Sequence, residues 1–295
     1  MTFGLRLQGR IFCAVSLVLV LALLVGFRAE PGHELLAVGA LVLLLGVPHG
    51  SLDVMVAHRL LGLSGISAWA MFSLVYVGLA GLVVGLWWVA PTVFLCAFLA
   101  FSALHFGADP ATGVSWTTRA LYGGAVIVLP ALWHGAELQR LLGLVAGPAS
   151  AAFIVPVLIW LAAPWLCAIA LAFFWEARTS PLAAMELAAL AAVSVTASPL
   201  VAFTVYFCVM HSPRHILRTL ASRHGADLRR ALAMALWPTA AVFTMAAVAG
   251  LLASGIPLET RVLQLSFVGL AALTLPHMAL LERARQASPV APHRQ

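Results

Sequence analysis

Residues 68–90 read AWAMFSLVYVGLAGLVVGLWWVA and contain no charged side chain. A helix needs about 20 mostly apolar residues to cross the hydrocarbon core of a bilayer, and this run is long enough. Similar runs repeat along the whole chain, with loops of only a few residues between them. The sequence therefore predicts an all-α fold, built as a multi-pass transmembrane helical bundle.

The composition supports the same conclusion. The 295 residues are 63% hydrophobic and 9% charged, and the mean hydropathy is +1.05. Soluble domains are about 25% charged, so this chain has too few polar side chains to cover a surface in water. The short loops leave no room for a soluble domain. We expect one integral membrane domain over residues 1–295, in which residues 284–295 form a flexible cytoplasmic tail.

The apolar runs predict eight to ten spans. Residues Ile11 to Phe27 resemble a signal peptide, but they lack a cleavage site, so we predict a retained span. Residues 182–217 form either one tilted helix or two short helices broken at Ser198 and Pro199. With the broken version, the spans lie near residues 11–27, 35–57, 68–90, 91–107, 119–135, 151–175, 182–198, 199–217, 231–254 and 262–281.

The arginines favour the broken version, with ten spans. Loops on the cytoplasmic side of a membrane are enriched in basic residues. Ten spans leave only Arg28, Arg140 and Arg261 outside. Both termini are then cytoplasmic, and we expect a multi-pass protein of the cell (inner) membrane. The arginines placed on the cytoplasmic side are Arg6, Arg10, Arg59, Arg119, Arg178, Arg214, Arg218, Arg223, Arg229, Arg230, Arg283, Arg285 and Arg294.

Charge and residue usage exclude some functions. The formal charge of +6 is spread between the spans instead of lying on one face, so we expect no nucleic-acid partner. All basic residues are arginine, which excludes a retinal Schiff base and therefore a rhodopsin-type photoreceptor. The four cysteines stand alone in apolar runs, and we interpret them as small buried hydrophobic residues.

Five histidines lie inside predicted spans: His49, His105, His211, His215 and His277. Ionisable residues are costly there, which makes them functional candidates. In the predicted orientation the spans that carry them all run the same way, so each histidine lies toward the cytoplasmic end. Ligands that converge from separate helices are what a metal site in a helical bundle needs. The remaining histidines, His33, His58, His134, His224 and His293, fall in loops or at span ends, where we expect solvation.

The local spacing adds detail to this hypothesis. His211 and His215 are four residues apart, which places two rings on one helix face, although Pro213 lies between them and opens the turn. Asp53 and Asp109 each follow a candidate histidine by four residues. A carboxylate there can accept the second ring N–H of a metal-bound histidine. The alternative for each aspartate is a charge at a helix end.

Imidazole ligands suit iron, zinc, copper or nickel. Zinc on three histidines would indicate hydrolysis, but the bundle has few polar residues for a polar substrate, so a redox metal with a lipid-soluble substrate fits better. A membrane di-iron lipid oxidase would need more histidines than the five in the predicted spans, and they would include adjacent His-His pairs. A metal or proton transporter that uses the histidines as a relay would need polar groups through the full depth of the membrane.

Four motifs, in order along nearly the whole chain, resemble the Brp/Blh family of membrane-bound β-carotene 15,15'-dioxygenases. This resemblance implies an Fe(II) enzyme that adds O₂ across the central double bond of β-carotene and releases two all-trans-retinal molecules, typically to supply a rhodopsin. The family's iron ligands map to His49, His105, His211 and His215, and His277 would lie in a second shell or line the substrate site. The motifs are Pro48-His-Gly-x-x-Asp53, His105-Phe-Gly-x-Asp109, His211-Ser-x-Arg-His215 and Pro276-His-Met278.

In such an enzyme the bundle would orient a linear polyene so that only its middle bond reaches the metal. Phe101, Phe106, Tyr206 and Phe207 lie near the motifs and are candidates for the walls of a substrate tunnel. Their alternative is packing against lipid or the core. The absence of lysine fits a protein that makes retinal without capturing it, and a dioxygenase needs no reductant.

Overall fold

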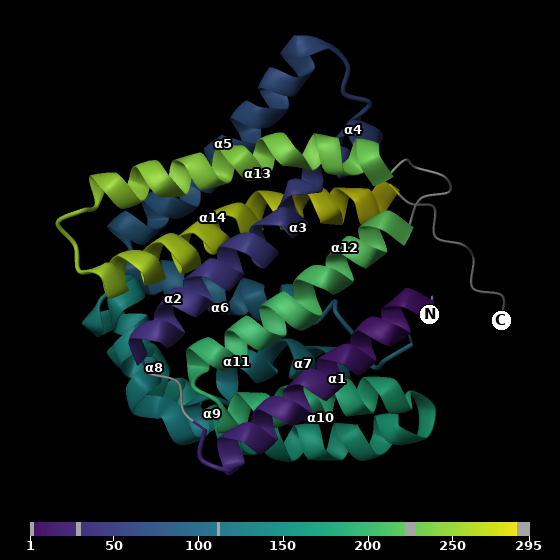
Figure 1. Cartoon of the computed structure of the whole chain (residues 1–295), viewed down its shortest axis with the longest axis vertical. Helices are drawn as coiled ribbons and strands as arrows, with labels where there is room; N and C mark the ends of the chain where they lie inside the picture. Colours follow the sequence, from purple (N-terminus) through teal and green to yellow (C-terminus); the bar gives the residue numbers. More distant parts are fainter. Residues whose placement is uncertain (1–2, 28–30, 111–112, 222–227, 288–295) are drawn as a thin grey trace.

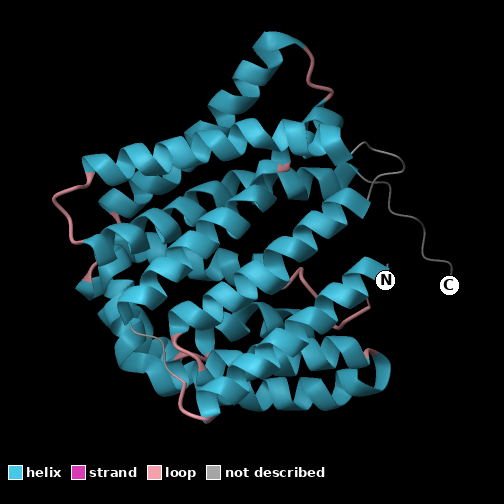
Figure 2. Cartoon of the chain, viewed as in Figure 1, coloured by secondary structure: helices cyan, strands magenta, loops and turns pink. Residues whose placement is uncertain are grey.

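The computed structural model describes residues 3–27, 31–110, 113–221 and 228–287 (Figure 1). The side chains of a few residues within helices, His49 among them, lie outside this description. All regular elements in the described ranges are helices, and no strand is found there (Figure 2). The predicted all-α class is therefore confirmed.

Each predicted span coincides with one or more helices. The prediction did not include α8: the run taken as one span at 119–135 is two helices, α7 and α8, which meet at an angle of 58°. The elements are α1 (Phe3–Leu24), α2 (Pro31–Leu41), the π-helix η1 (Val42–Gly46), α3 (Val47–Ser51), α4 (Asp53–Leu61), α5 (Gly65–Val89), α6 (Pro91–Phe106), α7 (Trp116–Val128), α8 (Ala131–Ala146), α9 (Pro148–Thr179), α10 (Pro181–Thr196), α11 (Pro199–Val205), the π-helix η2 (Tyr206–His211), α12 (Ser212–Ala221), α13 (Leu228–Leu252) and α14 (Leu258–Ala287).

Several of these helices are long and apolar enough to cross a membrane. In the described residues there are five, namely α1, α5, α9, α14 and residues Ala233–Leu252 of α13, or six if α7 and α8 form one bent span. No residue of α5 is buried within the protein, as expected for a helix that faces lipid. The apolar helices α6 and α10 are shorter. The count of eight to ten spans and the orientation of the termini stay predictions.

The break predicted at Ser198 and Pro199 is present. Helix α10 ends at Thr196, and α11 begins at Pro199, whose missing N–H and fixed φ suit the first position of a helix. The Ser198 hydroxyl accepts a hydrogen bond from the backbone N–H of Val201 at 3.4 Å and so caps the new helix. The other end of the chain differs from the prediction, because α14 continues to Ala287, into the expected tail. Residues 288–295 lie outside the description.

The helical segment α11–η2–α12 passes through the middle of the molecule (Figure 1). Its η2 turn packs against α1 and η1, and α12 packs against α1 and α3. Helix α1 also packs along α10, so it is part of the bundle. In Figure 1 the start of α1 and the ends of α12 and α14 lie on the same side of the view.

Candidate metal centre and its cavity

Two π-helical turns precede the motif prolines Pro48 and Pro213. A proline has no N–H for the carbonyl four residues earlier, so a helix opens at that point. For Pro213 this carbonyl belongs to Val209, and the Gln8 side-chain amide of α1 donates to it at 2.8 Å. Such π turns are common at functional sites. Helix α1 therefore supports the turn that carries Tyr206 and His211.

The structure brings together four of the five candidate imidazoles: those of His105, His211, His215 and His277. The ring centroids are 4.7 Å apart for His105 and His211, 5.3 Å for His105 and His277, and 4.9 Å for His215 and His277. Two imidazoles on one ion, with metal–nitrogen bonds of about 2.1 Å and an angle of about 90–110° between them, have centroids about 4.6–5.3 Å apart. The rings are thus neighbours at the spacing of shared ligands.

His49 lies on α3, but its side chain is outside the described part of the structure. Helix α3 packs against α12 and α14, which carry His215 and His277. Among the described side chains, no group of three or more His, Cys, Asp or Glu residues has the geometry of a formed metal site. The ligand set of His49, His105, His211 and His215 therefore stays a prediction.

Asp109 holds one of the rings. Its Oδ2 accepts hydrogen bonds from His211 Nδ1 at 2.9 Å and from the Tyr206 hydroxyl at 2.5 Å. The spacing predicted a partnership with His105, one turn earlier. That pairing is wrong because α6 ends at Phe106 and the chain turns away, so Asp109 leaves the face of the helix that carries His105.

Asp53 makes an equivalent pair of bonds on the other side of the cluster. Its Oδ1 accepts from His277 Nδ1 at 2.7 Å, and its Oδ2 accepts from the Tyr76 hydroxyl at 2.9 Å. The sequence suggested His49 as its partner, and this pairing stays a prediction because the His49 side chain is not described; the described partners come from α5 and α14. Because an ionised carboxylate only accepts, Nδ1 of His211 and of His277 carries a proton, and in a neutral ring Nε2 is then the nitrogen with a lone pair.

Two arginines fix the backbone at Asp109. The guanidinium of Arg218 donates to the carbonyls of Ala108 and Asp109, both at 2.7 Å, and Arg214 donates to the Asp109 carbonyl at 3.1 Å. Arg214 is fully buried and makes a two-pronged ion pair with Glu186 of α10, at 2.6 and 2.9 Å. Arg214, which the sequence analysis counted among the arginines on the cytoplasmic side, is thus buried within the bundle.

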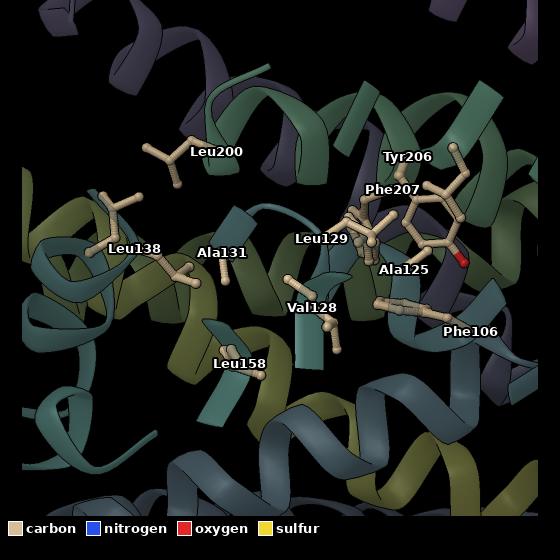
Figure 3. Packing of buried hydrophobic residues seen from close by; sticks show 14 of the residues in the cluster. Phe106, Ala125, Val128, Leu129, Ala131, Leu138, Leu158, Leu200, Tyr206 and Phe207 are labelled. Carbon is tan, nitrogen blue, oxygen red and sulfur yellow. The ribbon is translucent and has the colours of Figure 1, made fainter. Parts of the chain in front are cut away.

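His105, His211 and His277 line a small cavity that adjoins an apolar cavity. Both volumes share the lining residues Phe98, Ser102, Phe106 and Phe203, so the cavities are neighbours at that point. Figure 3 shows the packing along this direction, with Phe106, Tyr206 and Phe207 at one end and Leu138, Leu158 and Leu200 at the other. An apolar space thus begins at the imidazoles and continues into the core.

The four residues predicted to line a substrate tunnel have different positions in the structure. Phe106 and Phe207 line the histidine cavity. Tyr206 is fully buried and uses its hydroxyl to bind Asp109. Phe101 is 46% exposed on the outside of α6, so its assignment as a tunnel wall is wrong.

Sequence reasoning missed Phe98, Ser102 and Phe203 as lining residues, and it missed Tyr76 as a partner of Asp53. Phe98, Ser102 and Phe106 are spaced by four residues on α6, and Phe203, Phe207 and His211 are spaced in the same way on α11 and η2. This helical periodicity, followed backward from the histidines, could have found the lining residues. Tyr76 carries no such signal, because it lies on a different helix.

Comparison with known proteins agrees with the motif order. The family model for beta-carotene 15,15'-dioxygenase matches residues 40–283, a range that contains all five candidate histidines. The chain is 29% identical over 253 residues to the beta-carotene 15,15'-dioxygenase of the uncultured marine bacterium 66A03, covering 82% of this chain and 91% of the relative.

The chain is also 28% identical over 296 residues to the probable beta-carotene 15,15'-dioxygenase Blh of Halobacterium salinarum, covering 87% of this chain and 86% of the relative. No solved structure matches the chain. The family match extends over most of the bundle, from the end of α2 to the last turns of α14. On these grounds the chain belongs to the beta-carotene 15,15'-dioxygenase family.

Proposed function

We propose that this protein is an Fe(II)-dependent oxygenase that cleaves the central 15,15' double bond of β-carotene with O₂ and releases two all-trans-retinal molecules. The observation that carries this proposal is the group of neighbouring imidazoles next to an apolar cavity in the bundle. The names of the two relatives and of the family give the substrate and the bond. We infer a location in the cell membrane, with the metal centre toward the cytoplasmic side.

The residues of the cluster fit a transition metal. His49, His105, His211 and His215 would hold the iron, and neutral imidazoles are ligands that Fe(II) accepts. The bond from His211 Nδ1 to Asp109 fixes the tautomer in which Nε2 can bind a cation. Fe(II), when bound, would supply the redox chemistry that activates O₂. The protein's own task is to fix the rings and to place the substrate beside them.

The lining of the apolar cavity suits a hydrocarbon arm of a carotenoid. The described lining contains a single polar side chain, Ser102, so it would exclude water and accept a hydrocarbon arm. If one arm fills this cavity, the middle of the polyene lies beside the histidines, and position alone selects the bond to be cut. The reaction balances without a reductant, because each carbon of the broken double bond receives one atom of O₂.

The same cavity argues against a transporter. A path for protons or metal ions needs polar groups along its length. The described side chains that line the apolar cavity are apolar apart from Ser102, and several of them belong to α8. An oxygenase with a lipid-soluble substrate is the function that this lining supports better.

The proposal is tested with the full-length protein in detergent, supplied with Fe(II), air and β-carotene. We expect retinal as the product, measured by chromatography. The absence of any aldehyde, of any chain length and from any carotenoid, would contradict the proposed enzyme function.

A histidine variant adds a second readout to this experiment. His211→Ala is expected to lose bound iron and retinal formation while keeping its helical circular dichroism, because a proposed ligand is removed. His134→Ala is the matched control, because His134 pairs with Glu137 on α8, away from the cluster. If His211→Ala keeps one iron per chain, His211 is not a ligand.

A further inference from the structure

Two chains of hydrogen bonds in the structure have the same chemistry. One runs from the Tyr206 hydroxyl to Asp109 and on to His211 Nδ1, and the other runs from the Tyr76 hydroxyl to Asp53 and on to His277 Nδ1. Each chain joins a phenol, a buried carboxylate and one specific ring nitrogen. His211 is a predicted iron ligand, so the match raises the question of what His277 does.

His277 lies among the predicted ligands and not behind them. Its ring centroid is 5.3 Å from that of His105 and 4.9 Å from that of His215, and it lines the same cavity as His105 and His211. A histidine one layer further out would donate its N–H to a ligand. His277 instead donates from Nδ1 to Asp53, which is not a predicted ligand, and its Nε2 is buried.

The buried carboxylate of Asp53 also supports a metal ion at His277. This side chain is 2% exposed, and its hydrogen-bond partners among the described side chains are Tyr76 and His277. A buried carboxylate is costly unless a cation compensates it. A metal ion on Nε2 of His277 would supply that positive charge through the ring, as in the carboxylate–histidine–metal arrangements of many metalloproteins.

We propose that His277 is a direct ligand of the metal centre, and that Asp53 and Tyr76 position its ring. This inference rests on the proposed metal enzyme, but it changes the role of His277, which the sequence analysis placed in a second shell or on the substrate wall. The centre would then have two imidazoles held by carboxylates, His211 and His277, one on each side of the cluster.

The test measures metal binding without turnover. The full-length protein is freed of metal with a chelator and titrated with Co(II), whose visible absorption depends on the number and arrangement of its ligands. We expect His277→Ala to weaken Co(II) binding at least 10-fold and to change the absorption spectrum. Asp53→Asn, which removes the charge but keeps the shape, should weaken binding about 10–100-fold. Tyr76→Phe, which removes one bond to Asp53, should have a smaller effect in the same direction.

Thr274→Ala is the matched control, because Thr274 lies on α14 and lines the same cavity. It should bind Co(II) as the wild type does, since the hydroxyl of Thr274 bonds to the Leu270 carbonyl of its own helix. The proposal is overturned if Asp53→Asn and Tyr76→Phe both bind Co(II) with wild-type affinity and spectrum, or if the wild type binds no Co(II). A wild type that binds Co(II) through His277 but forms no retinal would support this inference while contradicting the proposed function.

Discussion

A single residue, Asp109, shows how distant parts of the chain build this site. Its carboxylate holds His211 from η2, and its backbone carbonyl is held by Arg214 and Arg218 from α12. Arg214 in turn is bound by Glu186 from α10 and by Gln8 from α1. The position of one imidazole thus depends on side chains from four segments of the sequence besides its own.

The ion pair of Arg214 with Glu186 gives a prediction for stability. Arg214→Ala should lower the free energy of unfolding by about 3–5 kcal/mol, because Glu186 would remain as an uncompensated buried charge. A thermal unfolding measurement of the protein in detergent checks this. Arg285→Ala is the control, because Arg285 forms an exposed pair with Glu282, and such pairs contribute little to stability.

A double variant tests whether the loss of stability comes from the unpaired buried charge. Replacing both members, Arg214→Met with Glu186→Leu, removes the buried charges together and should restore much of the loss. An Arg214→Ala protein as stable as the wild type would show that this pair does not hold α10 and α12 together.

At the scale of helices, much of the fold could be predicted from the sequence. Apolar runs of the right length identified the helices, and Ser198 with Pro199 identified the break before α11. Local patterns do not contain the pairings between helices: Asp109 with His211, Asp53 with His277 and Tyr76, and Arg214 with Glu186. These pairs are 23 to 224 residues apart and depend on how the helices pack.

The sequence also identified the candidate histidines and their motif order before the packing was known. It predicted an opening of the helix at Pro213, but it could not identify Gln8 of α1 as the donor to the Val209 carbonyl, since a proline alone does not say which residue replaces its missing N–H. Helix α8 was missed because its apolar run contains His134, Glu137 and Arg140, which read as a loop.

Helix α6 gives a prediction about the substrate. Ser102 lies where the two cavities adjoin, so Ser102→Trp should block the apolar cavity. We expect retinal formation to fall at least 10-fold while the iron content stays at the wild-type level, because no proposed ligand changes. Both quantities are measured on the same preparation.

Leu104→Trp is the matched control on the same helix, because Leu104 is 69% exposed on the outside of the protein. It should leave both iron content and retinal formation unchanged. Wild-type retinal formation by Ser102→Trp would mean that the carotenoid does not use this cavity.

At the scale of the whole molecule, the bundle places a polar cluster beside an apolar cavity. The histidines come from α6, η2, α12 and α14, and the cavity behind them is enclosed by α6, α7, α8, α9, α11 and α14. Exposed apolar residues on helices such as α5 suit a lipid environment, from which a carotenoid can enter. A retinal-binding rhodopsin would be a suitable acceptor for the product.

The most direct test of the central claim is a titration of metal-free protein with Fe(II) in the absence of O₂, followed by addition of β-carotene and air. Retinal is then measured against the iron bound. We expect the yield to rise in proportion to bound iron and to reach a plateau at one iron per chain, with two retinal molecules formed for each β-carotene consumed. A yield that does not depend on bound iron, or fully loaded protein that forms no retinal, would contradict the account.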